Sequence, residues 1–231
     1  MITLNNLTKT YGSKMAVDIQ NLEIKQGELT GLVGNNGAGK TTLFRLMLDL
    51  AKADKGEVLL LNENVAKNEN WKNYTAAYLD EGFLISYLTP KEYFYFVGKL
   101  HNLSNTAVDD FLQKFASFFD DSLQGNKKYI RDLSKGNQFK VGIVACLLQN
   151  PDLLILDEPF ANLDPSSQIR LINMLKELNE QKRTTILISS HDLNHIADAC
   201  KRVLLMENGV IIKDIQSSPN TLKELENYFN V

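Results

Sequence analysis

Residues 34–41 have the composition and spacing of a loop that binds phosphate. They read Gly-Asn-Asn-Gly-Ala-Gly-Lys-Thr, which fits the pattern of a glycine, four residues of any type, and then Gly-Lys-Thr or Gly-Lys-Ser. The apolar run 29–33 predicts a strand before the loop. The apolar residues after it, which predict a helix with one buried face, are Leu43, Leu46, Met47 and Leu50. Because a phosphate loop needs a strand before it and a helix after it, we favour this interpretation over a chance glycine-rich turn.

The loop predicts a nucleoside triphosphate, ATP, bound together with Mg²⁺. Its glycines let backbone N–H groups surround a phosphate, and the helix N-terminus adds partial positive charge. Lys40 should reach the β- and γ-phosphates, and the Thr41 hydroxyl should bind Mg²⁺. The residues predicted to bind ATP here are Gly34, Asn35, Asn36, Gly37, Ala38, Gly39, Lys40, Thr41 and Thr42.

Two adjacent carboxylates complete the predicted site. The continuous apolar run 153–156 is typical of a strand buried on both faces of a parallel sheet, and Asp157 and Glu158 follow it directly. Such a strand would deliver Asp157 to the Mg²⁺ at the carboxyl edge of the sheet. Glu158 suits a general base that activates water. A merely solvated strand end is the weaker interpretation, because a phosphate loop precedes the pair and Pro159 follows it.

Strands that alternate with helices predict an α/β fold with a parallel sheet. We predict one domain, residues 1–231, in which 83–149 form an inserted helical lobe and 1–82 with 150–231 form the core. The lobe should begin with a helix after Thr89, because Thr89 and Glu92 form a capping-box pattern. Its many aromatic residues predict helix core, with a docking surface as the alternative. Asn208-Gly209 predicts a hairpin, and Thr221 with Glu224 a short last helix.

Composition narrows the function. The 231 residues carry a net charge of −3, which argues against a nucleic-acid partner. The N-terminus has no secretory signal pattern, and no apolar run approaches the roughly 18 residues of a membrane span. We therefore expect a cytoplasmic protein. Cys146 and Cys200 lie far apart in apolar surroundings, which predicts buried, reduced thiols.

Three further segments make the pattern specific. Residues 133–138 read Leu-Ser-Lys-Gly-Asn-Gln, residues 162–164 read Asn-Leu-Asp, and His191 directly follows the predicted strand 184–190. With the phosphate loop and the run 153–158, in this order, the chain resembles the nucleotide-binding subunit of ABC transporters over nearly its whole length. The resemblance implies a P-loop NTPase core with a parallel sheet, an N-terminal antiparallel β subdomain and the inserted helical lobe.

The resemblance also implies roles and partners. Tyr11 would stack on adenine, and His191 would contact the γ-phosphate and take part in catalysis with Glu158 and Lys40. The family forms head-to-tail dimers, so Ser134 and Gly136 would act on the ATP of a partner subunit, in a homodimer or a heterodimer. ATP hydrolysis would then drive separate transmembrane permease subunits, with this chain peripheral on the cytoplasmic face. The compact build resembles subunits that pair with exporter-type permeases.

Two departures from the family pattern keep other functions open. Lys135 and Asn137 replace the common glycine and glutamine of the signature segment. Glu81, or Asp80 one residue earlier, stands where the family usually has a glutamine that touches Mg²⁺, so a carboxylate would take that metal position. A hydrolysis-impaired regulator is therefore one alternative. A soluble non-transport ABC-type ATPase and a P-loop kinase are others, but the short segment between Lys40 and Leu133 and the signature segment disfavour them.

Overall fold

The computed structural model describes residues 1–119, 128–218 and 221–223, with two sheets and the helices between and around them. The four-stranded sheet is antiparallel, in the order β2-β1-β4-β5. Its strands are β1 (Ile2–Tyr11), β2 (Lys14–Ile24), β4 (Lys55–Leu60) and β5 (Glu63–Asn64). The N-terminal antiparallel β subdomain expected from the resemblance is therefore confirmed.

The second sheet has six strands in the order β10-β9-β3-β8-β7-β6. Every neighbouring pair is parallel except β9 and β10, which form an antiparallel hairpin. The strands are β3 (Leu29–Val33), β6 (Thr75–Tyr78), β7 (Leu153–Leu156), β8 (Thr185–Ser190), β9 (Arg202–Glu207) and β10 (Val210–Gln216). The predicted parallel α/β fold is thus confirmed. Strands β3 and β7 are separated in this order by β8, which is made later in the chain.

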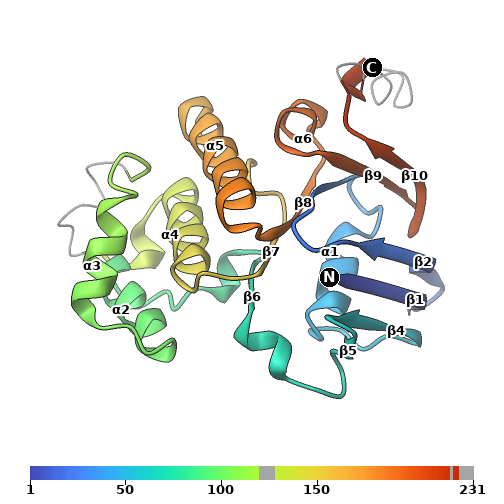
Figure 1. Ribbon diagram of the computed structural model, residues 1–231, viewed down its shortest axis with the longest axis horizontal. Helices are drawn as coiled ribbons and strands as arrows, with labels where there is room; N and C mark the ends of the chain where they lie inside the picture. The colour runs from blue at the N-terminus through green and yellow to red at the C-terminus, as the bar shows by residue number, and fades with distance from the viewer. Residues whose placement is uncertain (120–127, 219–220, 224–231) are drawn as a thin grey trace.

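Six α-helices lie between and around the sheets in the described residues: α1 (Lys40–Met47), α2 (Pro90–Leu100), α3 (Asn105–Gln113), α4 (Lys135–Leu148), α5 (Pro165–Lys182) and α6 (Leu193–Ala199). Short 3₁₀ turns cover Asn70–Asn73, Glu81–Phe83 and Ile130–Asp132. Helices α2, α3 and α4 gather on one side of the molecule, at the left of Figure 1, and the antiparallel sheet lies at the right.

Both faces of the six-stranded sheet are buried, which explains the unbroken apolar runs. Leu153 and Ile155 point into a core shared with α1 and the antiparallel sheet. Leu154 and Leu156 point the other way, into a core shared with α4, α5 and α6. Since successive side chains of a strand alternate between faces, each position of β7 must be apolar. Helix α1 is therefore held between the two sheets, directly behind the phosphate loop.

The local predictions have mixed outcomes. Thr89 and Glu92 form the predicted capping box, and Asn208 and Gly209 both have the positive φ of the predicted hairpin. The prediction that Leu50 belongs to the buried face of the first helix is wrong. Helix α1 ends at Met47 and Leu50 is half exposed, at 52%. The helix predicted from Thr221 runs into residues 224–231, which lie outside the described residues.

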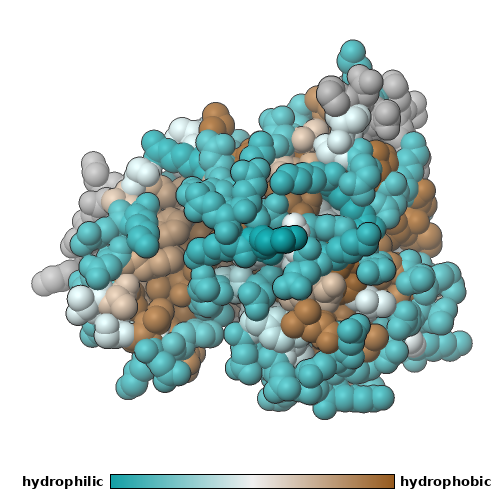
Figure 2. Space-filling view, viewed as in Figure 1, coloured by the Kyte–Doolittle hydropathy of each residue, from teal (hydrophilic) through white to brown (hydrophobic). Residues whose placement is uncertain are grey.

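Most of the aromatic residues of the helical region are core, as predicted. Phe94 and Phe118 are buried, and Tyr93, Phe111 and Phe115 pack partly buried against the same core. In Figure 2, hydrophobic side chains also reach the visible surface on the side where Figure 1 shows α2 to α4. The exposed large hydrophobic residues in and around this region are Phe83, Tyr87, Phe96, Leu100 and Tyr129.

Both cysteines are free and buried, as predicted. Burial raises the pKa of the Cys146 and Cys200 thiols to about 12, so both are protonated and unreactive at neutral pH. No helix among the described residues combines the length and the apolar character that crossing a membrane requires.

Helix α4 packs onto β6 at a glycine, and this contact predicts a large stability effect. A Cβ at Gly142 would lie only 2.1 Å from the ring of Tyr78. We expect Gly142→Ala to lower the free energy of unfolding by about 1–3 kcal/mol through overpacking, although alanine is the better helix former by roughly 1 kcal/mol. Urea denaturation measures this change. An unchanged midpoint would show that the ring can move aside, and Asn173→Ala on the exposed side of α5 serves as the neutral control.

Candidate functional site

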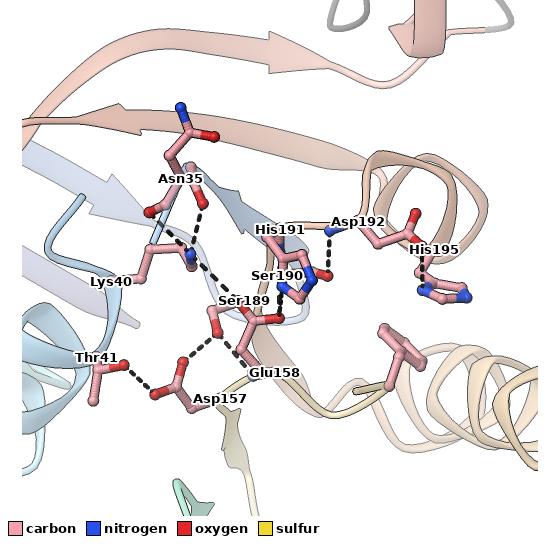
Figure 3. A network of polar contacts seen from close by, with 12 residues as sticks. Asn35, Lys40, Thr41, Asp157, Glu158, Ser189, Ser190, His191, Asp192 and His195 are labelled. Carbon is pink, nitrogen blue, oxygen red and sulfur yellow. Dashed lines mark hydrogen bonds and ion pairs between the residues drawn. The ribbon is translucent and has the colours of Figure 1, made fainter. Parts of the chain in front are cut away.

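The carboxyl ends of β3, β7 and β8 meet at one edge of the parallel sheet, and the polar residues that follow them converge there (Figure 3). Residues 34–39 leave β3 and lead into α1, Asp157 and Glu158 leave β7, and His191 leaves β8. Ligand sites in such sheets lie outside the carboxyl ends of the strands. The structure therefore brings together Lys40, Thr41 and the residues after β7 and β8, which the sequence placed far apart.

Two glycines of the loop are required by close backbone contacts. A Cβ at Gly34 would lie 2.3 Å from the Met206 carbonyl oxygen, and one at Gly39 would lie 2.2 Å from that of Ala16. Gly39 also has a φ of +112°, a backbone conformation that residues with a Cβ rarely adopt. Within the described chain, no side chain caps the N-terminus of α1, so its first N–H groups are available to an anion.

The Lys40 ammonium lies inside this loop and contacts both sides of the site. Its Nζ donates to the Gly34 carbonyl oxygen at 2.6 Å and lies 3.3 Å from Glu158 Oε1. Lys40 is buried, at 5% exposure, so these contacts are shielded from water. A buried cation beside the N-terminus of a helix is suited to binding a phosphate group.

Asp157 accepts hydrogen bonds from two hydroxyl groups. Thr41 Oγ1 donates to Oδ2, and Ser189 Oγ donates to Oδ1. Burial raises the pKa of the Asp157 carboxyl above its usual value, although the two hydroxyl groups and the Lys40 charge lower it in part. The ionised carboxylate is thus held in surroundings that disfavour its charge.

The raised pKa predicts a stability gain on neutralisation. A carboxyl whose pKa is raised on folding stabilises the fold below its unfolded pKa, and this contribution is lost as pH rises through the folded pKa. At neutral pH and without divalent cations, Asp157→Asn should therefore raise the melting temperature. Asp152→Asn, at the exposed residue before β7, should leave it unchanged. A lower melting temperature for Asp157→Asn would mean that its ionised form is stabilised.

Glu158 has an unusual backbone and contacts from three directions. Its φ is +48°, a backbone conformation that non-glycine residues adopt rarely. Its N–H donates to Ser189 Oγ at 2.9 Å, which holds this conformation. Its Oε2 lies 2.8 Å from His191 Nδ1, and its Oε1 faces Lys40. The carboxylate is 26% exposed, so water can reach it from the open side.

Ser189 was missed by the sequence analysis and is central to this arrangement. Its hydroxyl donates to Asp157 and accepts from the Glu158 N–H, so one residue of β8 orients both carboxylates. It is fully buried. The available signal was a serine at the carboxyl end of an otherwise apolar strand, directly before Ser190 and His191.

Tyr11 lies at the end of β1, where it pairs with Lys14 across the hairpin. This hairpin adjoins the phosphate loop, since Ala16 contacts Gly39 and the Lys14 ammonium lies 3.6 Å from the Cβ position of Gly37. The Tyr11 ring is 51% exposed, and the Lys9 ammonium lies 5.2 Å from its centre. One face of the ring therefore has a cation against it within the protein.

Ser134 and Gly136 lie away from this edge, at the N-terminus of α4 on the helical side of the molecule (Figure 1). Ser134 caps the helix by accepting from the Asn137 N–H at 3.2 Å. Gly136 packs against the loop after Glu158, because a Cβ there would lie 2.5 Å from the Asn162 carbonyl oxygen. In that loop Asp164 caps α5, and hydroxyl groups of Ser166 and Ser167 lower its pKa.

The carboxylate predicted to replace the family's glutamine is only partly described. Asp80 accepts from the Gly82 N–H at 2.8 Å and lies 3.8 Å from Arg45 Nη2, so it serves a turn and a surface ion pair. The side chain of Glu81 lies outside the described residues. Its role as a metal ligand stays a prediction.

Known proteins with similar sequences belong to the family that the sequence motifs resemble. The sequence profile of the ABC transporter family matches residues 17–161. The chain is 32% identical to the ABC transporter ATP-binding protein YhaQ of Bacillus subtilis, over 90% of this chain and 69% of YhaQ. It is 33% identical to the bacitracin transport ATP-binding protein BcrA of Bacillus licheniformis, over 93% of this chain and 69% of BcrA.

A solved structure agrees with these relatives. The dimeric, post-hydrolysis structure of the ATP-binding cassette MJ0796, bound to ADP and phosphate, superimposes with a TM-score of 0.83 at 25% identity. The match covers 94% of this chain and 99% of that one. The chain therefore belongs to the ABC transporter family, in which it is an ATP-binding subunit with ATPase activity.

Proposed function

We propose that this chain pairs head to tail with a second ATP-binding subunit around ATP and Mg²⁺, and that hydrolysis moves separate membrane-spanning subunits. The observation that carries the proposal is the convergence of Lys40, Thr41, Asp157, Glu158 and His191 at one sheet edge. A cation, a hydroxyl, two carboxylates and an imidazole are the groups that phosphoryl transfer to water requires.

Residues 34–42 would bind the phosphates. The N–H groups at the start of α1 would donate hydrogen bonds to the anionic oxygens, and Lys40 would exchange its contact with the Gly34 carbonyl for one with phosphate. Tyr11 would stack on adenine with its exposed face. Base stacking on an aromatic ring contributes on the order of 1–3 kcal/mol and accepts any base, so Tyr11 would add affinity more than selectivity.

Thr41 and Asp157 fit a Mg²⁺ site. They offer hard oxygen donors in direct contact with one another, and no lysine or arginine of the described residues forms an ion pair with the buried Asp157 carboxylate. No group of three or more His, Cys, Asp or Glu residues in the described chain is arranged to hold a metal alone. This suits Mg²⁺, which takes one or two protein ligands together with phosphate oxygens and water. When bound, it would neutralise charge on the phosphates.

Glu158 would act as the general base. One carboxylate oxygen would take a proton from water on the exposed side of the residue, while Lys40 and His191 hold the carboxylate in place. His191 is 56% exposed and would donate a hydrogen bond to the γ-phosphate. The positive φ of Glu158, held by the Ser189 hydroxyl, would set the direction in which its side chain leaves the backbone, and a base needs a precise direction.

The partner subunit would complete the site. Ser134 and Gly136 lie at the N-terminus of α4, on another part of the molecule from the chain's own phosphate loop. The Ser134 hydroxyl, the N–H groups and the helix N-terminus would therefore act on ATP held by the partner.

We further propose that 83–149 form the inserted lobe of a single domain 1–231, with 1–82 and 150–231 as its core. The exposed residues Phe83, Tyr87 and Phe96 of this lobe would contact a membrane-spanning subunit at the cytoplasmic face of the membrane.

The test is the molar mass of the Glu158→Gln protein by light scattering, with and without Mg²⁺ and ATP. Removing the base should trap ATP, so the mass should double when both are added and stay monomeric with ATP plus a chelator. A protein that binds ATP but never changes mass would exclude self-pairing and point to a sister subunit. Mixing with candidate sister subunits would then show the shift that the single chain lacks.

A further inference from the structure

We propose that Gln168 and His195 form a clamp that positions Glu158, by tying the loop after β7 to the loop after β8. The clamp lies one layer behind the reacting groups, and neither residue touches the predicted ATP site in the described structure. The proposal rests on the role of Glu158 given above, and its test is designed to be decided separately.

The clamp is a directional chain of hydrogen bonds. Gln168 Nε2, from α5, donates to the Phe160 carbonyl oxygen at 3.0 Å. Gln168 Oε1 lies 3.2 Å from His195 Nε2, from α6. Because an amide oxygen can only accept, the proton of this bond must sit on His195 Nε2. The orientation of each group is thereby determined by the next.

An aromatic contact strengthens the same connection. The rings of Phe160 and His195 have centroids 4.8 Å apart and planes inclined by 35°. Phe160 is almost fully buried, at 2% exposure, so its position is set by this packing. Asp192 lies 3.4 Å from His195 Nδ1 on the remaining side of the imidazole and also caps α6. The His195 ring is thus surrounded by Phe160, Gln168 and Asp192.

The clamp holds both ends of the Glu158 contact network. Phe160 is two residues after Glu158, and His195, in α6, is four residues after His191. The Glu158 carboxylate and His191 meet at 2.8 Å on the open side, and Phe160 and His195 meet behind them. Two loops joined at two points cannot slide past each other. This restraint matters because Glu158 has a positive φ that must be held by its surroundings.

The phosphate- and metal-binding groups of α1 and β7 are held without this clamp. Lys40 and Thr41 belong to α1, which is held between the two sheets, and Asp157 is held by Thr41 and Ser189. Loosening the clamp should therefore affect the chemical step and leave ATP binding unchanged. A residue that served only general stability would alter both.

The experiment compares Gln168→Met and His195→Phe with wild type. Methionine keeps the side-chain volume and removes both hydrogen bonds, and phenylalanine keeps the ring contact and removes the Nε2 donor. We expect kcat for ATP to fall about 10-fold in each, because small misplacements of a reacting group are costly, with KM and melting temperature unchanged. Gln181→Met is the matched control, since the exposed Gln181 on the same helix bonds only to Glu177 among the residues that the structure describes.

Hydrogen exchange of the protein without ATP provides a readout independent of turnover. In both variants the N–H groups of residues 158–164 should exchange about 10-fold faster, and those of β7 should not change. Wild-type kcat together with wild-type exchange in this loop would refute the clamp, as would a joint loss of kcat, ATP affinity and melting temperature. If the wild-type protein does not hydrolyse ATP, the proposed role of Glu158 fails, and the exchange rates still decide whether the clamp restrains the loop.

Discussion

Glu158→Gln should lower ATP turnover about 100-fold or more, since general-base catalysis contributes at least this factor. The substitution keeps the shape of the side chain and an oxygen that can face His191 Nδ1. It removes the negative charge that faces Lys40 and the oxygen that would take the proton. ATP affinity should stay the same or increase, because one carboxylate near the phosphates is lost. Phosphate release under saturating ATP measures the turnover, and equilibrium binding measures the affinity.

A matched substitution separates this effect from general damage. Asp198→Asn, on the exposed side of α6, removes a carboxylate of the same part of the fold and should leave turnover at the wild-type rate. Retention of turnover in Glu158→Gln would show that another group takes the proton. His191 would then be the next residue to change, because it is the titratable neighbour of Glu158 on its exposed side.

Lys40→Met should lower ATP affinity about 10- to 100-fold, the range of a hydrogen bond made by a charged group. Methionine fills the buried volume of the lysine stem but supplies no charge to the phosphates. The loop itself should keep its path, because its glycines are held by the carbonyl oxygens of Ala16 and Met206. Isothermal titration with Mg²⁺ and ATP measures the affinity.

The exposed Lys52, just beyond α1, offers the control for this change, since Lys52→Met removes the same charge and should bind ATP normally. A Lys40→Met protein with wild-type affinity would mean that the helix N-terminus alone holds the phosphates. A large fall in melting temperature would instead show that the contact of Lys40 with Gly34 and Glu158 supports the fold.

The sequence was sufficient for the fold and for the groups that meet at the sheet edge. The unbroken apolar run of β7 follows directly from burial on both faces of the sheet. The spacing of the loop glycines follows from close backbone contacts, as at Gly39. Order along the chain then placed Lys40, Asp157 and His191 at one edge, because parallel strands end together.

What the sequence could not provide depends on contacts between distant segments. The double role of Ser189 follows from β8 lying beside β7, and serine is too common at strand ends to be noticed alone. The positive φ of Glu158 is imposed by its surroundings, against its own preference. Leu50 matched the helical spacing, but Asp49 with a φ of +51° turns the chain away before Leu50 reaches the core.

The order of strands in the six-stranded sheet has a consequence for how the protein is made. Strand β8 fills the gap between β3 and β7, although it is translated after both. The ribosome must therefore reach residue 190 of 231 before the phosphate loop and the two carboxylates can be fixed relative to one another. Until then a nascent chain exposes unpaired edges of β3 and β7 and holds no complete site. Synthesis and the ability to use ATP are thereby separated in time, and the growing chain needs protection at those edges until its last third emerges.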